Sequence, residues 1–311
     1  MDQVVAVVGP TASGKTELAV ALARALGGEV ISADSRQVYR RLDAGTAKPS
    51  RDAQGLVEGI AYHLVDVADP AETFDAGRFA RLAGEVLAQI KGRGRVPIVA
   101  GGTGLYVRAL LEGLSEMPPS DPKIRERLTA AAKEEGRSAL HERLSKIDPA
   151  AAAAIPANNI QRVLRALEVY ELTGKPISSF WTRDKKSSAN AVFFLIDWPN
   201  DELKARVKLR AERMWPDMLE ETKRLLAAGF SGAEPGFQSL GYREAISVSK
   251  GELSRDEGLA LLIRSTNQYA KRQRTWFKNQ TPGARVIPGG PLDAMVAKAL
   301  EALHVTPALA R

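Results

Sequence analysis

A glycine-rich segment near the N-terminus has the residue types and the spacing of a phosphate-binding loop. It fits the pattern Gly-x-x-x-x-Gly-Lys-Ser/Thr and lies between a run of valines, expected to form a buried strand, and a stretch with helical apolar spacing. The glycines would let backbone N–H groups wrap a phosphate chain at the positive end of the helix. Lys15 would place a charge on the phosphate oxygens, and the Thr16 hydroxyl would hold Mg²⁺. The segment therefore predicts a phosphate-bearing ligand and leaves the reaction open; its members are Gly9, Pro10, Thr11, Ala12, Ser13, Gly14, Lys15 and Thr16.

Two more polar residues follow expected strands. Asp34 comes directly after an expected strand at residues 29–33, and Thr103 follows another at residues 96–100. Because the carboxyl ends of parallel strands meet at one edge of a sheet, both residues should lie near the phosphate loop. Either residue could also be no more than a cap for the turn or helix that follows it.

The order of the expected elements predicts an α/β fold. Strands and helices alternate through the first third of the chain, as in a P-loop NTPase-like, doubly wound parallel sheet. After a proline-rich stretch at residues 117–122 only helical segments are expected, so the core should carry an inserted all-helical domain. A strand resumes at residues 191–197. The predicted domains are the first part of the core at 1–116, the helical insertion at 117–190 and the second part of the core at 191–311.

The C-terminal part should be helical and basic. The pattern predicts a helix at residues 203–228 that breaks near Pro216, because proline lacks the N–H of a helix interior, and a long helix at residues 254–277. Between Glu257 and Asp293 the chain has no acidic residue but six basic ones. Such a stretch, interleaved with aromatic residues, is typical of nucleic-acid contact, although a solvated face over core aromatics would look the same. The basic residues are Arg264, Lys271, Arg272, Arg274, Lys278 and Arg285, and the aromatic ones are Tyr269, Trp276 and Phe277.

Composition narrows the classes of protein further. The 311 residues include 44 Lys and Arg against 37 Asp and Glu, a net charge of +7 that favours a polyanionic partner. The chain has no cysteine, which excludes disulfides and thiolate sites, and no apolar run of the ~18 residues that a membrane helix needs. We therefore expect a cytoplasmic protein with no membrane association. His63, His141 and His304 lack metal-ligand spacing and should be structural or exposed.

Longer motifs give the sequence a family resemblance. They lie at residues 34–40 with 45–49, 101–106, 161–168, 241–244 and 268–277. In this order they resemble the tRNA dimethylallyltransferases, the bacterial tRNA isopentenyltransferase family, from Val4 to about Phe277. The resemblance implies transfer of a dimethylallyl group from dimethylallyl diphosphate to the exocyclic amine of the adenosine on the 3′ side of the anticodon. It also implies a Mg²⁺ requirement and, as partner, the anticodon stem-loop of a subset of tRNAs; we expect the enzyme to be a monomer.

The resemblance also implies roles for individual residues. Asp34 would hydrogen-bond the adenine amine and take its proton, which suits a nucleophile whose lone pair is delocalised into the ring. Thr103, Arg210 and Lys15 would bind the diphosphate, where negative charge grows as the carbon–oxygen bond breaks. The positions implied to contact tRNA are Asp34, Ser35, Arg36, Gln37, Thr103, Arg125, Gln161, Arg162, Val163, Leu164, Arg165, Lys271 and Arg272.

Three other functions share parts of this pattern. A small-molecule kinase would use the same phosphate loop, with Asp34 accepting a hydroxyl proton and the helical insertion acting as a lid. An RNA-binding module could use a nucleotide only as a switch and modify neither ligand. An adenine-nucleotide isopentenyltransferase would share the chemistry but would not need the insertion face that carries Gln161 and Arg165. The acid-free aromatic helix and the motif at residues 101–106 favour the tRNA enzyme over the kinase.

Overall fold

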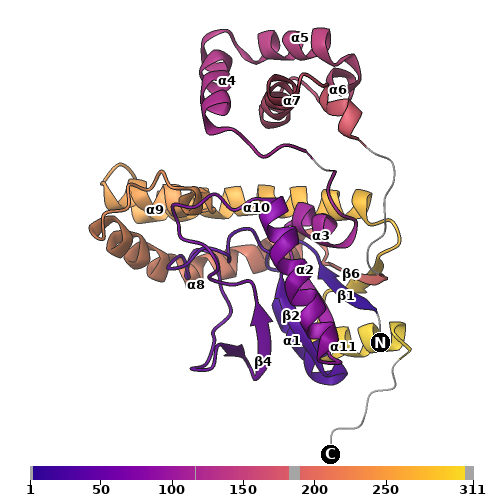
Figure 1. Ribbon diagram of the computed structural model, residues 1–311. Coiled ribbons are helices and arrows are strands. Elements are labelled where there is room, and N and C mark those ends of the chain that lie inside the picture. The colour runs from indigo at the N-terminus through magenta and orange to yellow at the C-terminus, as the bar shows by residue number, and fades with distance from the viewer. Residues whose placement is uncertain (1–2, 116, 182–189, 305–311) are drawn as a thin grey trace, which may run out of the picture. The chain divides into compact units, whose positions relative to one another are not determined.

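The computed structural model describes residues 3–115, 117–181 and 190–304 (Figure 1). The chain divides into two compact units, one made of residues 1–112 with 187–311 and the other of residues 113–186. The sequence placed the second unit at 117–190, and residues 182–189 of that range lie outside the described residues. Among the helices that the structure describes, none is both long and apolar enough to cross a bilayer.

The larger unit is built on one seven-stranded sheet. Its strands are β1 (Val4–Val8), β2 (Gly28–Ser32), β3 (Leu56–Val57), β4 (Ile60–His63), β5 (Val96–Gly101), β6 (Ala191–Asp197) and β7 (Arg285–Pro288). They lie in the order β3-β4-β2-β5-β1-β6-β7, and every pairing except β3–β4 is parallel. Because β2, β5 and β1 are neighbours, the loops that follow these three strands leave the sheet side by side.

Helices cover both faces of the sheet. Residues on β1 alternate between two cores, as the period of two in a strand requires. Val5 and Val7 pack in one core with α1 (Lys15–Leu26) and α11 (Leu292–Ala302). The alternate residues Val4, Ala6 and Val8 pack in the other core. That core also contains residues of α2 (Ala76–Gly92), α3 (Gly104–Leu111), α8 (Asn200–Ala227) and α10 (Arg255–Gln280). This arrangement confirms the predicted doubly wound α/β fold.

The helix break predicted near Pro216 is wrong. Helix α8 runs without interruption from Asn200 to Ala227 with the proline inside it. Pro216 lies on the exposed face, where water can bind the carbonyl that loses its intrahelical donor. On the buried face, Trp215 packs into the core and its Nε1 donates to the Arg255 carbonyl oxygen at 3.0 Å, which holds α8 against the start of α10. Figure 1 shows these two long helices side by side.

The sequence pattern also missed one parallel strand. Strand β4 pairs with β2 through Val30–Tyr62 and Ile31–His63, so it extends the sheet beyond β2. It is four residues long and only Tyr62 is buried, so it lacks the continuous buried apolar run that marks the central strands β1 and β5.

The smaller unit is helical, as the sequence predicted for the inserted segment. It contains α4 (Pro122–Glu134), α5 (Arg137–Ile147), α6 (Pro149–Ala154), α7 (Ile160–Thr173) and the short η1 (Ile177–Phe180). It has its own hydrophobic core, in which Leu128, Leu140 and Leu144 of α4 and α5 pack against Val163 and Leu167 of α7.

Candidate active site

The phosphate loop follows β1 and leads into α1, as predicted. Gly14 caps the helix at φ 92°, a left-handed conformation that glycine adopts without strain. Lys15 Nζ folds back over the loop and donates to the Pro10 carbonyl oxygen at 2.6 Å. Burial and, next, the neighbouring Arg210 guanidinium lower the pKa of Lys15 to about 8. A cation whose charge is destabilised in this way gains most from an incoming anion.

Two arginines one helical turn apart on α8 reach the same loop. Arg206 Nε donates to the Ala12 carbonyl oxygen at 2.8 Å, and its guanidinium lies 4.4 Å from the Trp198 ring centre. Arg210 Nη2 donates to Thr11 Oγ1 at 2.8 Å. Within the described residues neither guanidinium forms an ion pair with a carboxylate. The resemblance singled out Arg210, and the structure places it beside the loop together with Lys15.

Asp34 and Thr103 meet at the carboxyl ends of β2 and β5. Asp34 Oδ1 accepts the Arg36 backbone N–H at 2.8 Å, which is the turn-capping contact that the sequence left open. Thr103 Oγ1 accepts the Ser35 N–H at 2.9 Å and lies 3.2 Å from Ser35 Oγ. Asp34 and Thr103 therefore both hold the turn at residues 34–36. Asp34 also lines the cavities described next.

Two adjoining cavities lie at this edge of the sheet. The smaller, about 80 Å³, is polar and is lined by Lys15, Thr16 and Gln37 among others. The larger, about 260 Å³, has an apolar wall that includes Met214 and Leu262. Five residues line both cavities and so mark the passage between them: Thr11, Asp34, Thr46, Arg210 and Tyr269.

A buried glutamine joins two loops of the site, and the sequence indicated it only as part of the motif at residues 268–277. Gln273 on α10 is 7% exposed; its Oε1 accepts the Thr11 N–H at 2.7 Å, and its Nε2 donates to the Gly102 carbonyl oxygen at 2.9 Å. A side chain on Gly102 would overlap this amide, since an added Cβ would lie 2.2 Å from Nε2. Gln273 thus ties the phosphate loop to the turn that carries Thr103.

The basic stretch on α10 divides into two groups. Arg274 Nε and Lys278 Nζ pair with the Asp197 carboxylate at 2.7 and 2.9 Å, so these two cations already have a partner. Lys271 and Arg272 are exposed, and Arg272 also lines the larger cavity. The second group, which is the pair singled out for tRNA, is the one available to an RNA phosphate.

The aromatic residues of α10 divide in the same way. Phe277 is fully buried, and Trp276 packs over Gly104, where an added Cβ would lie 2.2 Å from the ring. Phe277 therefore belongs to the core, whereas Trp276 is half-buried at its edge. Tyr269 lines both cavities, with the Arg272 guanidinium 5.7 Å from its ring centre. Tyr269 and Trp276 are therefore the two aromatic residues of this stretch that line a hollow, each beside Arg272.

In the helical unit, three of the predicted RNA contacts form one network. Arg125 and Arg165 pair with the fully buried Glu168 at 3.3 and 2.9 Å, and Arg125 Nη2 donates to Gln161 Oε1 at 2.7 Å. Burial opposes ionisation of Glu168, but hydrogen bonds from Ser120 and Arg165 hold its pKa below the usual value. The network fixes the arginines on the face that also carries the exposed Arg162.

Three of the residues implied to contact tRNA have other roles. The side chains of Val163 and Leu164 lie in the core of the helical unit, 0% and 2% exposed, so they offer RNA no side-chain surface. Gln37 is buried, accepts the Ser32 hydroxyl at 3.0 Å and donates to the Ala47 carbonyl oxygen at 3.2 Å. We therefore retain none of these side chains as RNA contacts.

Two of the three histidines have clear structural partners. His63 Nε2 lies 2.7 Å from the Glu29 carboxylate, and His141 Nε2 lies 2.8 Å from the Ile155 carbonyl oxygen. His304 is exposed.

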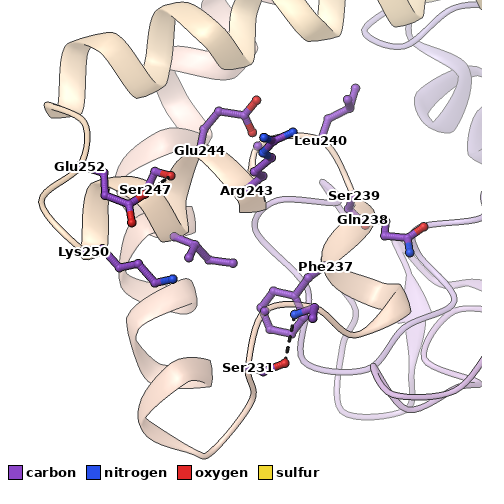
Figure 2. A pocket seen from close by; sticks show the side chains of 14 residues that line it. Ser231, Phe237, Gln238, Ser239, Leu240, Arg243, Glu244, Ser247, Lys250 and Glu252 are labelled. Carbon is purple, nitrogen blue, oxygen red and sulfur yellow. Dashed lines mark hydrogen bonds between the residues drawn. The ribbon is translucent and has the colours of Figure 1, made fainter. Parts of the chain in front are cut away.

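A further hollow of the larger unit lies next to this site and contains none of the residues singled out for the chemistry. It measures about 560 Å³ and is formed by η2 (Pro235–Gln238), the turn after it and α9 (Tyr242–Ser249), as Figure 2 shows. Gln238, Ser239 and Leu240 line this hollow and the larger cavity alike, so the segment separates the two.

Most of the chain matches known family models. The model described as IPP transferase matches residues 37–280, and the one described as isopentenyl transferase matches residues 2–62. The chain belongs to the IPP transferase family. Relatives named tRNA dimethylallyltransferase include one from Anaeromyxobacter dehalogenans (strain 2CP-C), 47% identical over 89% of this chain and 92% of the relative. Another, from Geobacter sulfurreducens, is 44% identical over 89% of each chain.

Solved structures of the same family share the fold. The tRNA isopentenylpyrophosphate transferase of Bacillus halodurans is 37% identical, with a TM-score of 0.71 over 98% of this chain and 96% of that one. A eukaryotic dimethylallyltransferase captured acting on tRNA is 24% identical, with a TM-score of 0.79 over 99% of this chain and 81% of that one. The second comparison supports the fold, and the first, with the relatives above, supports the family.

Proposed function

We propose that this member of the IPP transferase family transfers a dimethylallyl group from dimethylallyl diphosphate to the exocyclic amine of an adenosine in the anticodon loop of tRNA. The single observation that carries the proposal is the pair of adjoining cavities. One is polar and bounded by cations, the other has an apolar wall, and Asp34 faces both. The diphosphate of the donor needs the polar cavity, and its uncharged prenyl group needs the cavity with the apolar wall.

The smaller cavity is suited to the leaving group. Backbone N–H groups of the phosphate loop, Lys15 and Arg210 would hold the diphosphate oxygens. As the bond between the first prenyl carbon and oxygen breaks, the bonding electrons stay on oxygen and negative charge grows there. Cations fixed beforehand around that oxygen lower the barrier, because they are already oriented before the charge develops.

The larger cavity is suited to the acceptor. The dimethylallyl group would lie against the apolar wall, and the adenine would enter beside Tyr269 and Arg272. A bond forms between the amine nitrogen and the first prenyl carbon, and the nitrogen gives up one proton. Asp34, at the passage between the cavities, is the carboxylate placed to accept that proton.

Mg²⁺ is part of this proposal. The Thr16 hydroxyl lines the smaller cavity at the start of α1, and in the described part of the chain no cluster of three acidic or histidine side chains competes for the ion. A hydroxyl and the diphosphate oxygens fit a cation that keeps several of its waters. When bound, the ion would neutralise charge on the leaving diphosphate.

RNA phosphates would be held by cations outside the smaller cavity. Lys271 and Arg272 on α10, and Arg162 with the Arg125–Arg165 network on the helical unit, would contact phosphates and position the loop. We further propose that the enzyme acts as a monomer.

A donor exchange tests the proposal. The protein is incubated with Mg²⁺ and an anticodon stem-loop RNA, once with dimethylallyl diphosphate and once with ATP, and the RNA is weighed by mass spectrometry. We expect the RNA to gain one five-carbon unit with the prenyl donor and nothing with ATP. No prenyl gain, together with consumption of ATP when a small alcohol replaces the RNA, would favour the small-molecule kinase instead.

A further inference from the structure

Two motifs that the sequence singled out, and that the site leaves without a role, pack against each other. They are residues 45–49 and residues 241–244. The ring of Tyr242, which is fully buried, lies directly over Gly45: a Cβ added to Gly45 would be 2.5 Å from two ring carbons. Gly45 has no left-handed backbone angle, so its lack of a side chain serves this close approach.

A buried carboxylate on α8 completes the contact. Glu221 is 3% exposed, and its Oε2 accepts the backbone N–H groups of Asp43 and Ala44 at 2.8 and 3.0 Å. Its Oε1 accepts the Tyr242 hydroxyl at 2.5 Å. Burial and, next, the charge of Glu221 raise the pKa of Tyr242, so the hydroxyl keeps its proton and remains a donor. We call Glu221 and Tyr242 the clamp.

The segment held by the clamp, residues 43–47, is a wall of the site; we call it the strap. Gly45 and Thr46 line the larger cavity, and Thr46 and Ala47 line the smaller one. Its far end is fixed by Gln37, whose Nε2 donates to the Ala47 carbonyl oxygen.

The backbone of the strap needs these contacts. Arg41, just before it, and Ala47, at its end, have φ values of 66° and 47°. Residues with a side chain hold such angles only where the surrounding structure imposes them. Here Glu221 satisfies two strap N–H groups and Gln37 binds the carbonyl at Ala47.

We propose that Glu221 and Tyr242 are positioning residues for the transfer reaction: through the strap they set the width of the passage in which amine and prenyl carbon meet. The proposal rests on the proposed function. Neither residue lines either cavity, and the wall that both of them contact is the strap, residues 43–47; Tyr242 alone also packs beside Phe237 and Ser239. The phosphate loop is held by other contacts, from Gln273, Arg206 and Arg210.

Four variants test the clamp. Gly45→Ala forces the ring and the strap apart, and Tyr242→Phe removes the contacts of the hydroxyl with Glu221 and with the Gly45 backbone. Glu221→Gln can keep the geometry, because its amide oxygen can accept the two N–H groups while its nitrogen donates to the tyrosine oxygen. Glu220→Gln is the matched control, since Glu220 is the exposed neighbour on the same helix, paired with Lys223.

The measurements are the single-turnover rate of prenyl transfer at saturating substrates and the affinity for inorganic diphosphate by calorimetry. Both are made at a temperature at which circular dichroism shows each variant folded. For Gly45→Ala we expect a loss on the order of 10²-fold in rate, the effect of a displacement of about 1 Å. For Tyr242→Phe we expect about a tenfold loss, from a smaller displacement. Glu221→Gln and Glu220→Gln should stay near the parent rate, and diphosphate affinity should stay within about twofold throughout.

Two results would overturn the clamp. If folded Gly45→Ala and Tyr242→Phe transferred at the parent rate, the contacts would serve stability alone. If diphosphate affinity fell in step with the rate, the variants would disturb the whole site and no separate positioning role would remain. A parent protein that prenylates no RNA would refute the proposed function, and the clamp with it.

Discussion

The two cavities of the site lie next to each other and are lined by different kinds of chemical group. Around the smaller one, the groups that face a ligand are backbone N–H groups, a hydroxyl and two cations that have no carboxylate partner among the described residues. Around the larger one they are aliphatic side chains with Arg36 and Arg272, while Asp34, Tyr269 and Arg210 line both cavities. The first set suits a leaving group that gains negative charge, and the second suits an acceptor that loses a proton. The difference implies that each half of the reaction can be damaged without the other.

Asp34→Asn should have the largest effect, and it should damage only the acceptor half of the reaction. Asparagine keeps the size and one oxygen, so the contact to the Arg36 N–H survives, but it cannot take a proton. We expect turnover to fall by about 10²–10⁴-fold, as for loss of a general base. The dissociation constants for diphosphate and for tRNA should stay within a few-fold. They are measured by calorimetry and filter binding beside single-turnover rates; a variant that transfers near the parent rate would leave Asp34 as a turn cap only.

At the phosphate end, Lys15→Ala should damage binding and chemistry together. In the proposed site the lysine would contact phosphate in both the ground state and the transition state, so diphosphate affinity and the single-turnover rate should both fall, the rate by about 10²-fold. Lys204→Ala is the matched control: it removes a lysine that lines neither cavity and is already paired with Asp201. Near-normal diphosphate affinity in Lys15→Ala, measured by calorimetry, would move the donor away from the loop.

The pH dependence of diphosphate binding tests whether the charge of Lys15 is used at the phosphate end of the site. The pKa of Lys15 is lowered to about 8, so the free protein loses this charge as the pH rises through that value. Affinity should therefore fall between pH 7 and pH 9, by at most about tenfold per pH unit above the pKa. Lys15→Ala should remove this dependence and leave only the titration of diphosphate itself. Parallel pH profiles for parent and variant would show that the Lys15 charge is not used in binding.

The smallest expected effect is on the salt dependence of tRNA affinity, which should distinguish the unpaired cations of α10 from the paired ones. The log–log salt slope of tRNA affinity should flatten by about one unit for each phosphate contact removed, so Lys271→Ala with Arg272→Ala should flatten it by about two. Arg274→Ala with Lys278→Ala should leave the slope unchanged, because Asp197 already holds both side chains. The slopes come from binding titrations at several salt concentrations, and the reverse pattern would assign the RNA to the other group.

The parts of the site that could be predicted are those set by local spacing. The phosphate loop, Asp34 and Thr103 each follow a strand, and parallel strands bring their carboxyl ends to one edge. The basic stretch of α10 was also visible as composition, although its division into paired and unpaired cations depends on Asp197, which lies far away in the sequence.

What could not be predicted depends on contacts between distant segments. Gln273 reaches Thr11 across 262 positions, and Glu221 reaches Asp43 across 178. No periodicity of the chain carries such information. Pro216 misled the prediction for the opposite reason: a local rule holds for a helix interior in general, but here the lost hydrogen bond falls on the exposed face of a helix that is held by its buried face.

The most direct test of the account is an acceptor competition in one vessel. The protein, Mg²⁺ and dimethylallyl diphosphate are mixed with an anticodon stem-loop that has adenosine 3′ to the anticodon, a matched stem-loop whose purine at that position lacks the exocyclic amine, and free adenosine monophosphate. The products are separated and analysed by tandem mass spectrometry. The account predicts one five-carbon unit on the adenosine stem-loop, at the amine of that adenosine, and none on the other two acceptors. Prenylation of the amine-free stem-loop or of the free nucleotide in preference to the adenosine stem-loop, or of no acceptor, would contradict it.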